Sequence, residues 1–307
     1  MLRFALLRIL GAIPTLFVVI AVAFMLVHAA PGGPFDSERV LLPEVEQSIL
    51  QAYHLDEPLP QQFARYLRGV LRGDFGPSYT HSEYDVSEII FASFPVSFLL
   101  GAYALITALT LGVFFGLVAA LRRNTAIDHL LSGLAMTGIS IPVFVIAPVM
   151  VLLFAVHLGW LPASFSGGTG AGRFVLPVIA LALPQLAYFA RLFRASMIEV
   201  LESDYIRTAR AQGLSTVSII RHHALKPALL PLVSYLGPAI AAVLTGSVVV
   251  EQIFGIPGLG QHFVNGALNR DYTLVLGLVI FYAALIITLN LFVDLLYRYL
   301  DPRTRRQ

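Results

Sequence analysis

The sequence has no cysteine and few charged residues. Charged residues occupy 12% of its 307 positions, about half of the ~25% that is usual in soluble globular proteins, whereas hydrophobic residues occupy 57%. A soluble domain with so little charge would expose large apolar patches, and a disordered chain is less hydrophobic. The lack of cysteine excludes disulfides, thiolate metal sites and a thiol nucleophile. The composition therefore indicates a polytopic membrane protein.

Lysine is almost absent as well. Lys226 is the sole lysine, and no phosphate-binding Gly-x-x-x-x-Gly-Lys-Ser/Thr loop precedes it. No Gly-x-Ser-x-Gly or His-Glu-x-x-His motif is found. We therefore expect no nucleotide hydrolysis, no metal site and no catalytic residue in this chain. An intramembrane hydrolase with a dyad outside these patterns remains an alternative.

Long stretches without Asp, Glu, Lys or Arg are what the sequence does contain. A spanning helix needs about 20 mostly apolar residues, and such stretches predict six spans. They are expected near residues 9–30, 89–121, 130–158, 174–190, 227–250 and 272–293. Cleavage of the first as a signal peptide is an alternative, but its apolar run exceeds the usual 7–15 residues.

The positions of the charges predict the orientation. Six spans place both ends on one side, and most of the 20 basic residues then fall on that side, which the positive-inside bias assigns to the cytoplasm. The first outer loop, 31–88, is acidic and longer than a connection requires. It is expected to contain one helix that begins at Pro43-Glu44, a second over 60–71, and a turn at 73–77.

No span has an ionisable residue near its middle. Ion-coupled carriers usually place such residues there, whereas Glu251 and Asp294 lie only at span ends. A secondary transporter is therefore disfavoured, although unwound backbone can also bind ions. Gly112 and Gly116 fit the small-residue pattern of close helix packing. Packing within one chain explains this pattern as well as a contact between two subunits would.

A basic segment between the fourth and fifth spans has the pattern helix, Gly213, helix. Ile206, Ala209 and Gln212 recur at helical spacing, and the small residues here allow close approach by another protein. Gly213 is expected to adopt a left-handed turn that ends the first helix. The alternative is a plain basic loop with a glycine C-cap.

This segment resembles the conserved cytoplasmic loop of ABC-transporter permeases, in the form found in peptide permeases. The resemblance extends over essentially the whole chain and is greatest to the oligopeptide branch of the family. Further matching stretches are 14–17, 30–35, 73–78, 93–97, 122–125 with Asp128, 251–261, 269–272 and 301–305.

The segment departs from the general ABC permease loop at two places. The Glu-Ala-Ala of that loop would fall at Arg207-Thr208-Ala209, and its Ile-x-Leu-Pro ending is replaced by residues 223–226, with Pro227 one place later. The departures match the peptide-permease form. They leave any role of the loop glutamate in doubt.

The resemblance implies an all-α polytopic membrane protein with the ABC importer type I permease fold. Residues 1–30 would form the cytoplasmic N-terminal end and first span, 31–90 a periplasmic helical loop, 91–297 the transmembrane domain with a coupling loop at about 199–226, and 298–307 a cytoplasmic tail. The chain would translocate oligopeptides across the inner membrane by alternating access, without catalysis. The same fold serving dipeptides, murein peptides or other small substrates is an alternative.

The resemblance also implies partners. They are a homologous second permease subunit, two ABC ATPase subunits that use ATP and Mg, a periplasmic peptide-binding protein that docks on the outer loop, the peptide and membrane lipid, but no nucleic acid. The chain itself would bind no cofactor. The coupling residues would be Tyr205, Ile206, Arg207, Thr208, Ala209, Arg210, Ala211, Gln212, Gly213, Leu214 and Ser215.

Glu251, Phe254 and Pro257 are expected near the outer end of the fifth span. We assign them to the outer gate or to peptide contact. The alternative for Glu251 is a helix-end carboxylate at the water interface.

Overall fold

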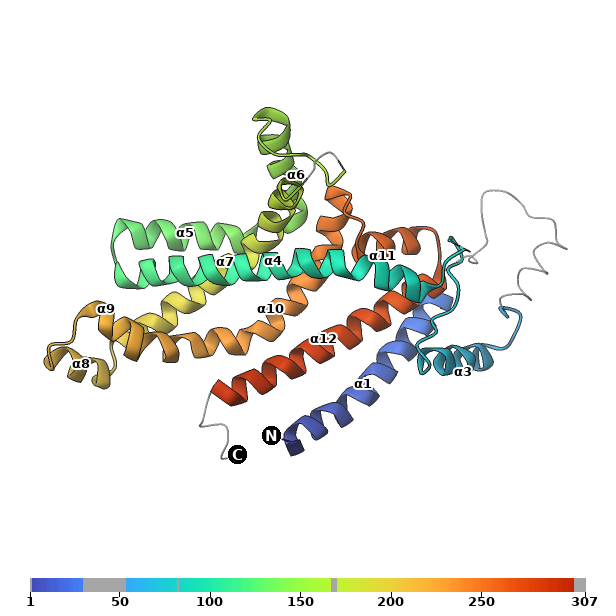
Figure 1. The fold of residues 1–307 in the computed structure, drawn as a ribbon, viewed down its shortest axis with the longest axis horizontal. Coiled ribbons are helices and arrows are strands. Elements are labelled where there is room, and N and C mark those ends of the chain that lie inside the picture. Colours follow the sequence, from blue (N-terminus) through green and yellow to red (C-terminus); the bar gives the residue numbers. More distant parts are fainter. Residues whose placement is uncertain (1, 30–53, 82, 167–169, 301–307) are drawn as a thin grey trace. The chain divides into compact units, whose positions relative to one another are not determined.

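The computed structural model describes residues 2–29, 54–81, 83–166 and 170–300. Within these ranges the regular structure is helical (Figure 1), as the sequence predicts. The helices are α1 (Leu2–Ala29), α3 (Leu59–Val70), α4 (Val86–Leu121), α5 (Ala126–Ser140), α6 (Val143–Met150), η1 (Val151–His157), α7 (Gly172–Leu201), α8 (Asp204–Ala211), α9 (Thr216–Ile219), η2 (Ile220–Ala224), α10 (Leu225–Phe254), α11 (Leu259–Leu268) and α12 (Tyr272–Leu300).

Five stretches in the described part of the chain are long and apolar enough to cross a membrane, or six if one bent pair counts as a span. The five are Leu6–Ala29, Val86–Leu121, Gly172–Leu201, Thr216–Phe254 and Tyr272–Arg298. The third expected span is the bent pair, since α5 and α6–η1 meet at 106°. Pro142 explains the break, because proline donates no backbone hydrogen bond and disfavours helical geometry at the preceding residue.

The chain divides into two compact units. The larger unit comprises Ser97–Ile256 and Thr288–Gln307, and the smaller unit comprises Leu2–Val96 and Pro257–Ile287.

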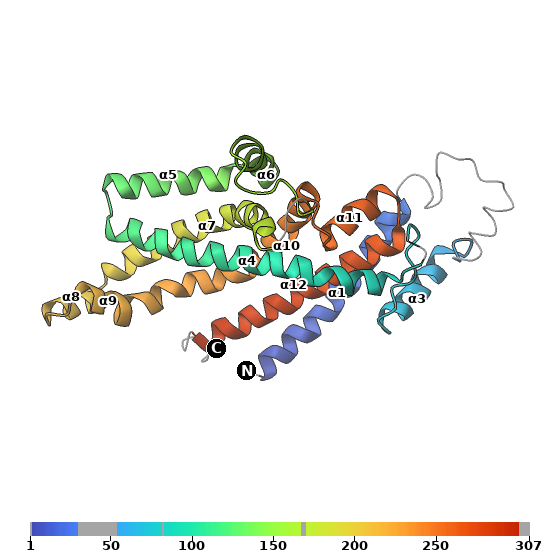
Figure 2. The ribbon, with the colours of Figure 1, turned by 45° about the horizontal axis from the view of Figure 1, so that its top comes forward.

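In the larger unit, α4 and α5 both pack against α7 (Figure 2). Gly116 permits this approach, because a Cβ atom there would lie 2.6 Å from the carbonyl oxygen of Ala190 on α7. Gly112 is as close to Phe189, at 2.7 Å from its Cβ atom. The Gly112–Gly116 pattern therefore serves packing within one chain, which is one of the two predicted alternatives.

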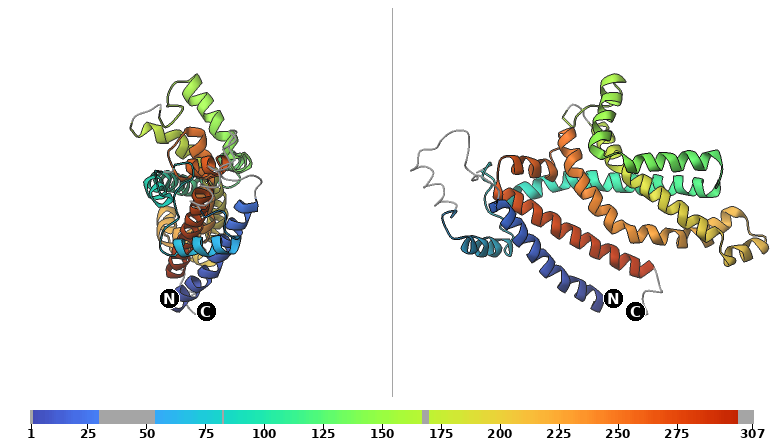
Figure 3. Two further views of the ribbon diagram at one scale, coloured as in Figure 1. Left: turned by 90° about the vertical axis from the view of Figure 1, so that its right-hand side faces the viewer. Right: turned by 180° about the vertical axis from the view of Figure 1, so that it is seen from behind.

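In the smaller unit, α3 lies beside α1 (Figure 3), and aromatic side chains join the two helices. The Phe63 ring contacts Phe24 edge-to-face, with 5.2 Å between the ring centroids, and Phe17 at 6.1 Å. Helix α3 confirms the helix predicted over 60–71. The helix predicted to begin at Pro43-Glu44 lies outside the described residues, as does the family-like stretch 301–305.

A second apolar cluster in the smaller unit joins the start of α4 to α11 and α12. Its buried members are Val86, Ile89, Ile90, Leu259, Leu274 and Leu278. Phe75 packs against them, so the turn predicted at 73–77 is anchored on this cluster.

Candidate functional site

Helices α8 and α9 form a short segment between two long apolar helices. The backbone of Ser203 is extended before α8, and Asp204 places a carboxylate in the first turn, where the helix dipole favours it. Gly213 ends α8 with φ of +81°, the left-handed geometry that glycine adopts without steric cost. The Ser215 hydroxyl then accepts a hydrogen bond from the Ser218 N–H and caps α9. The predicted helix–Gly213–helix pattern is therefore present.

The α8 helix has one inward and one outward face. Ile206 is 0% exposed and Ala209 is 5% exposed, whereas Tyr205 is 48% exposed. Ile206 and Ala209 are therefore not accessible on the surface of α8, and they anchor this helix on the rest of the unit. The exposed predicted residues are Tyr205, Arg207, Thr208, Arg210, Ala211, Gln212, Gly213, Leu214 and Ser215.

The outward face combines cationic and apolar groups. Arg207 makes an exposed ion pair with Asp204 at 3.4 Å, a type that contributes little stability. Arg210 is exposed, and Val217 on α9 is 74% exposed. Exposed tyrosine and arginine side chains, such as Tyr205 and Arg210 here, are enriched at protein-binding surfaces.

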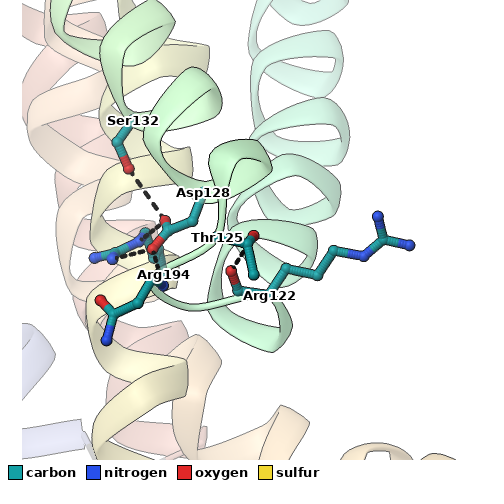
Figure 4. Close-up of polar contacts among 6 residues, drawn as sticks. Arg122, Thr125, Asp128, Ser132 and Arg194 are labelled. Atoms are coloured by element: carbon teal, nitrogen blue, oxygen red, sulfur yellow. Dashed lines mark hydrogen bonds and ion pairs between the residues drawn. The ribbon is translucent and has the colours of Figure 1, made fainter.

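A buried ion pair joins α5 to α7 (Figure 4). Arg194 Nε donates to Asp128 Oδ1 at 2.6 Å, and Arg194 Nη2 donates to Asp128 Oδ2 at 2.8 Å. The Asn124 N–H and the Ser132 hydroxyl donate to the same carboxylate. Asp128 is 1% exposed, so this bidentate pair fully satisfies a carboxylate that would otherwise be costly to bury.

A second ion pair lies between the α4–α5 turn and the end of α7. Arg123 pairs with Glu202, which directly follows α7 and lies two positions before α8. Asn124 adopts φ of +62° in this turn, while the side chain of Arg122 points away from Asp128 (Figure 4). The two ion pairs thus hold the α4–α5 turn against the end of α7 that leads into α8.

The resemblance points to the 122–128 stretch, but the sequence alone does not predict these pairings. The available signal was Asp128, a lone carboxylate in the first turn of an otherwise charge-free helix, since such a residue usually has a partner. Its partner is 66 residues away in the sequence, so spacing alone does not reveal Arg194.

At the other end of α10, Glu251 is 0% exposed and Phe254 is 1% exposed. The Phe254 carbonyl accepts a hydrogen bond from the Phe165 N–H at 2.8 Å, and the Glu251 carbonyl accepts one from Ile256 at 2.9 Å. The side chain of Glu251 is thus enclosed by the protein at this end of α10. Pro257 is exposed and belongs to the smaller unit.

In the smaller unit, the buried carboxylate of Asp271 precedes α12. Burial raises the pKa of this carboxyl, but hydrogen bonds from the Ser78 hydroxyl and the N–H groups of Thr80, Leu274 and Tyr79 lower it more. The net effect is a pKa below its usual range. The Ser78 contact is 2.5 Å, and it ties the family-like stretches 73–78 and 269–272 together. Among the described residues, no three His, Asp or Glu side chains converge to hold a metal ion.

Comparison with known proteins gives a consistent set of relatives. Residues 112–306 match the family described as binding-protein-dependent transport system inner membrane component, and residues 1–101 match the N-terminal region of such components. The oligopeptide transport system permease protein OppB of Escherichia coli (strain K12) is 52% identical over 99% of this chain and 100% of that protein. The dipeptide transport system permease protein DppB of Bacillus subtilis (strain 168) is 42% identical over 99% of this chain and 98% of that protein.

Among solved structures, an inward-facing form of the MetNI methionine ABC transporter has a similar fold. The TM-score is 0.55 at 18% identity, over 69% of this chain and 96% of that chain. At this identity the likeness concerns the fold alone.

Proposed function

Because this chain belongs to the family of binding-protein-dependent transport system inner membrane components, we propose that it is the permease subunit of an ATP-driven importer of oligopeptides. Oligopeptide permeases at 50–52% identity support this substrate class over dipeptides, for which the relative from Bacillus subtilis is 42% identical. Murein peptides and other small substrates remain the alternative within the family.

The observation that carries the proposal is the exposed α8–α9 segment between two spans. Only Glu202 and Ser203 separate α7 from α8, while α9, η2 and α10 follow one another without a break. A displacement of α8 is therefore passed directly to the ends of α7 and α10. We assign α8–α9 as the coupling helix that docks on an ATPase subunit, with Tyr205, Thr208 and Arg210 on the docking face.

In this mechanism, two ATPase subunits hydrolyse ATP with Mg, and their closure pushes on α8. The ends of α7 and α10 then swing, so that a cavity shared with a homologous second permease subunit alternates between inward- and outward-facing states. This chain lies in the inner membrane with both termini in the cytoplasm. Its long loop after α1 receives the periplasmic peptide-binding protein, and no chemistry is done on the peptide.

Introduced cysteines test the docking assignment directly, because the chain has none of its own. We expect Thr208→Cys in the assembled transporter to form a thiol-specific crosslink to an ATPase subunit. Gln61→Cys, an exposed position on α3, is the matched control and should form none. Equal crosslinking at the two positions, or none at Thr208→Cys in a complex that contains the ATPases, would refute the assignment.

We further assign Glu251 to the outer gate or to peptide contact, because ionisable residues within transmembrane segments usually mark a substrate pathway. Glu251→Gln removes the charge but retains the shape. We expect slower peptide uptake with unchanged assembly. Transport kinetics equal to those of the unaltered protein would exclude this role.

A further inference from the structure

The exposed faces of α7 and α10 differ from those of the other spanning helices in the larger unit. Between 180 and 248, the exposed positions on these two helices hold small, polar or charged residues and no Leu, Ile, Phe or Met. Examples are Tyr188, Arg191 and Ala195 on α7 and Ser234, Ala242 and Thr245 on α10.

Helix α4 shows the opposite composition. Its exposed residues include Phe98, Leu99, Ile106 and Phe114, as expected for a surface that meets lipid tails. Polar side chains within a span instead face the bundle interior or a water-filled cavity, because lipid offers them no hydrogen bonds. Between 180 and 248, the exposed positions of α7 and α10 therefore lack the composition expected of a lipid-facing surface.

Two tyrosines meet in the middle of this face. The Tyr188 and Tyr235 rings stack with their centroids 4.0 Å apart and their planes 20° from parallel. Phe189 packs edge-on against Tyr235 at 5.9 Å, which fixes the pair from behind. Tyr188 is nevertheless 38% exposed, and it lies about 20 Å from either end of α7 at 1.5 Å per residue.

The polar atoms of this pair are available for a ligand. Neither tyrosine hydroxyl makes a hydrogen bond to a described residue. Gln185, one helical turn before Tyr188, has a buried Oε1 that accepts no hydrogen bond from the described part of the chain. Such groups usually have partners when water is excluded, and these three have none among the described residues.

We propose that the stacked pair Tyr188–Tyr235 is the surface over which the peptide moves, with Gln185 as a further contact. The inference rests on the proposed function and names a site for its substrate. Hydroxyl and amide groups match the backbone amides that every peptide shares, while the aromatic faces pack against side chains of any type. The site would thus bind oligopeptides without selecting a sequence.

Photocrosslinking in the assembled transporter tests this contact. We expect benzoylphenylalanine in place of Tyr188 or Tyr235 to capture a radiolabelled oligopeptide in an ATP-dependent manner. Tyr103 is the matched control, since this tyrosine is 49% exposed on α4 and should capture only background label. Capture at 188 and 235 no greater than at 103, or capture only of lipid or the second permease subunit, would overturn the inference.

The paired variant Tyr188→Phe with Tyr235→Phe separates contact from folding. It keeps the stacked rings and removes both hydroxyls, so we expect the KM for peptide uptake to rise about three- to ten-fold per lost hydrogen bond. An unchanged KM would contradict the hydroxyl contact, whereas failure of the unaltered complex to import peptide would refute the proposed function itself.

Discussion

At the scale of single residues, two buried carboxylates fix parts of the chain that are far apart in sequence. Asp128 binds Arg194 and thereby joins α5 to α7, and Asp271 binds Ser78 and thereby joins the segment before α4 to the start of α12. Both carboxylates accept several hydrogen bonds, which offsets the cost of removing a charge from water. Loss of either should therefore destabilise more than loss of an exposed charge.

We predict that Asp128→Asn lowers the stability of the purified protein by about 2–4 kcal/mol, because Arg194 is left without its charged partner. The matched control is Arg123→Gln, which breaks the exposed pair with Glu202 and should cost under about 1 kcal/mol. Thermal unfolding of both variants in detergent measures the difference. Equal losses of stability would show that burial of the Asp128 pair contributes nothing.

The hydrogen bonds at Asp271 predict a pH dependence. The pKa of Asp271 is lowered in the folded protein. The carboxylate therefore contributes to the folding stability above the pKa of an unfolded aspartate, about 3.9. This contribution is lost as the pH falls through the pKa of the folded state. We expect Asp271→Asn to destabilise the protein at neutral pH. The difference in stability between the variant and the unaltered protein should become smaller below about pH 4. Melting temperatures of both proteins, recorded from neutral pH to below about pH 4, test this prediction. A gap that stays constant down to acid pH would contradict the assigned network.

At the scale of elements, α8 and α9 combine a fixed inner face with an exposed outer one. Ile206 and Ala209 anchor the segment, and the ion pairs of Arg194 and Arg123 hold the neighbouring turn against α7. A push on the outer face would therefore move several helix ends together.

We predict that Gly213→Pro uncouples ATP hydrolysis from peptide import. Proline requires φ near −65°, whereas Gly213 has φ of +81°, so the turn between α8 and α9 must change. Arg210→Glu should have the same effect through its charge, while Arg68→Glu on α3 is the matched control. The measurements that test this prediction are peptide uptake and ATPase rates, on membranes with equal amounts of inserted protein. Uptake equal to that of the unaltered protein in both α8–α9 variants would refute the coupling assignment.

The elements were largely predictable from the sequence, but their faces and bends were not. Apolar stretches and capping signals located α3, α4 and α12, and Gly213 marked the end of α8. Whether Ile206 faces inward depends on tertiary contacts, and a 106° bend at Pro142 cannot be distinguished from a mild kink by composition. The Asp128–Arg194 pair and the burial of Glu251 likewise depend on helices that meet only in the folded chain.

At the scale of the whole molecule, the scarcity of charge and the absence of catalytic motifs fit a subunit that depends on others. The family assignment places this chain among membrane components of binding-protein-dependent systems. In the proposed assembly, energy comes from the ATPase subunits, and peptide selection comes largely from the binding protein. In the same proposal, this chain contributes to the translocation pathway and provides the coupling segment α8–α9.

The most direct test of this account is reconstitution of the chain with its second permease subunit, two ATPase subunits and the peptide-binding protein in liposomes. We predict that peptide-loaded binding protein stimulates ATP hydrolysis and that labelled peptide accumulates only when ATP is supplied. Peptide uptake by this chain alone, abolished by an uncoupler and indifferent to ATP, would contradict the account and indicate an ion-coupled carrier.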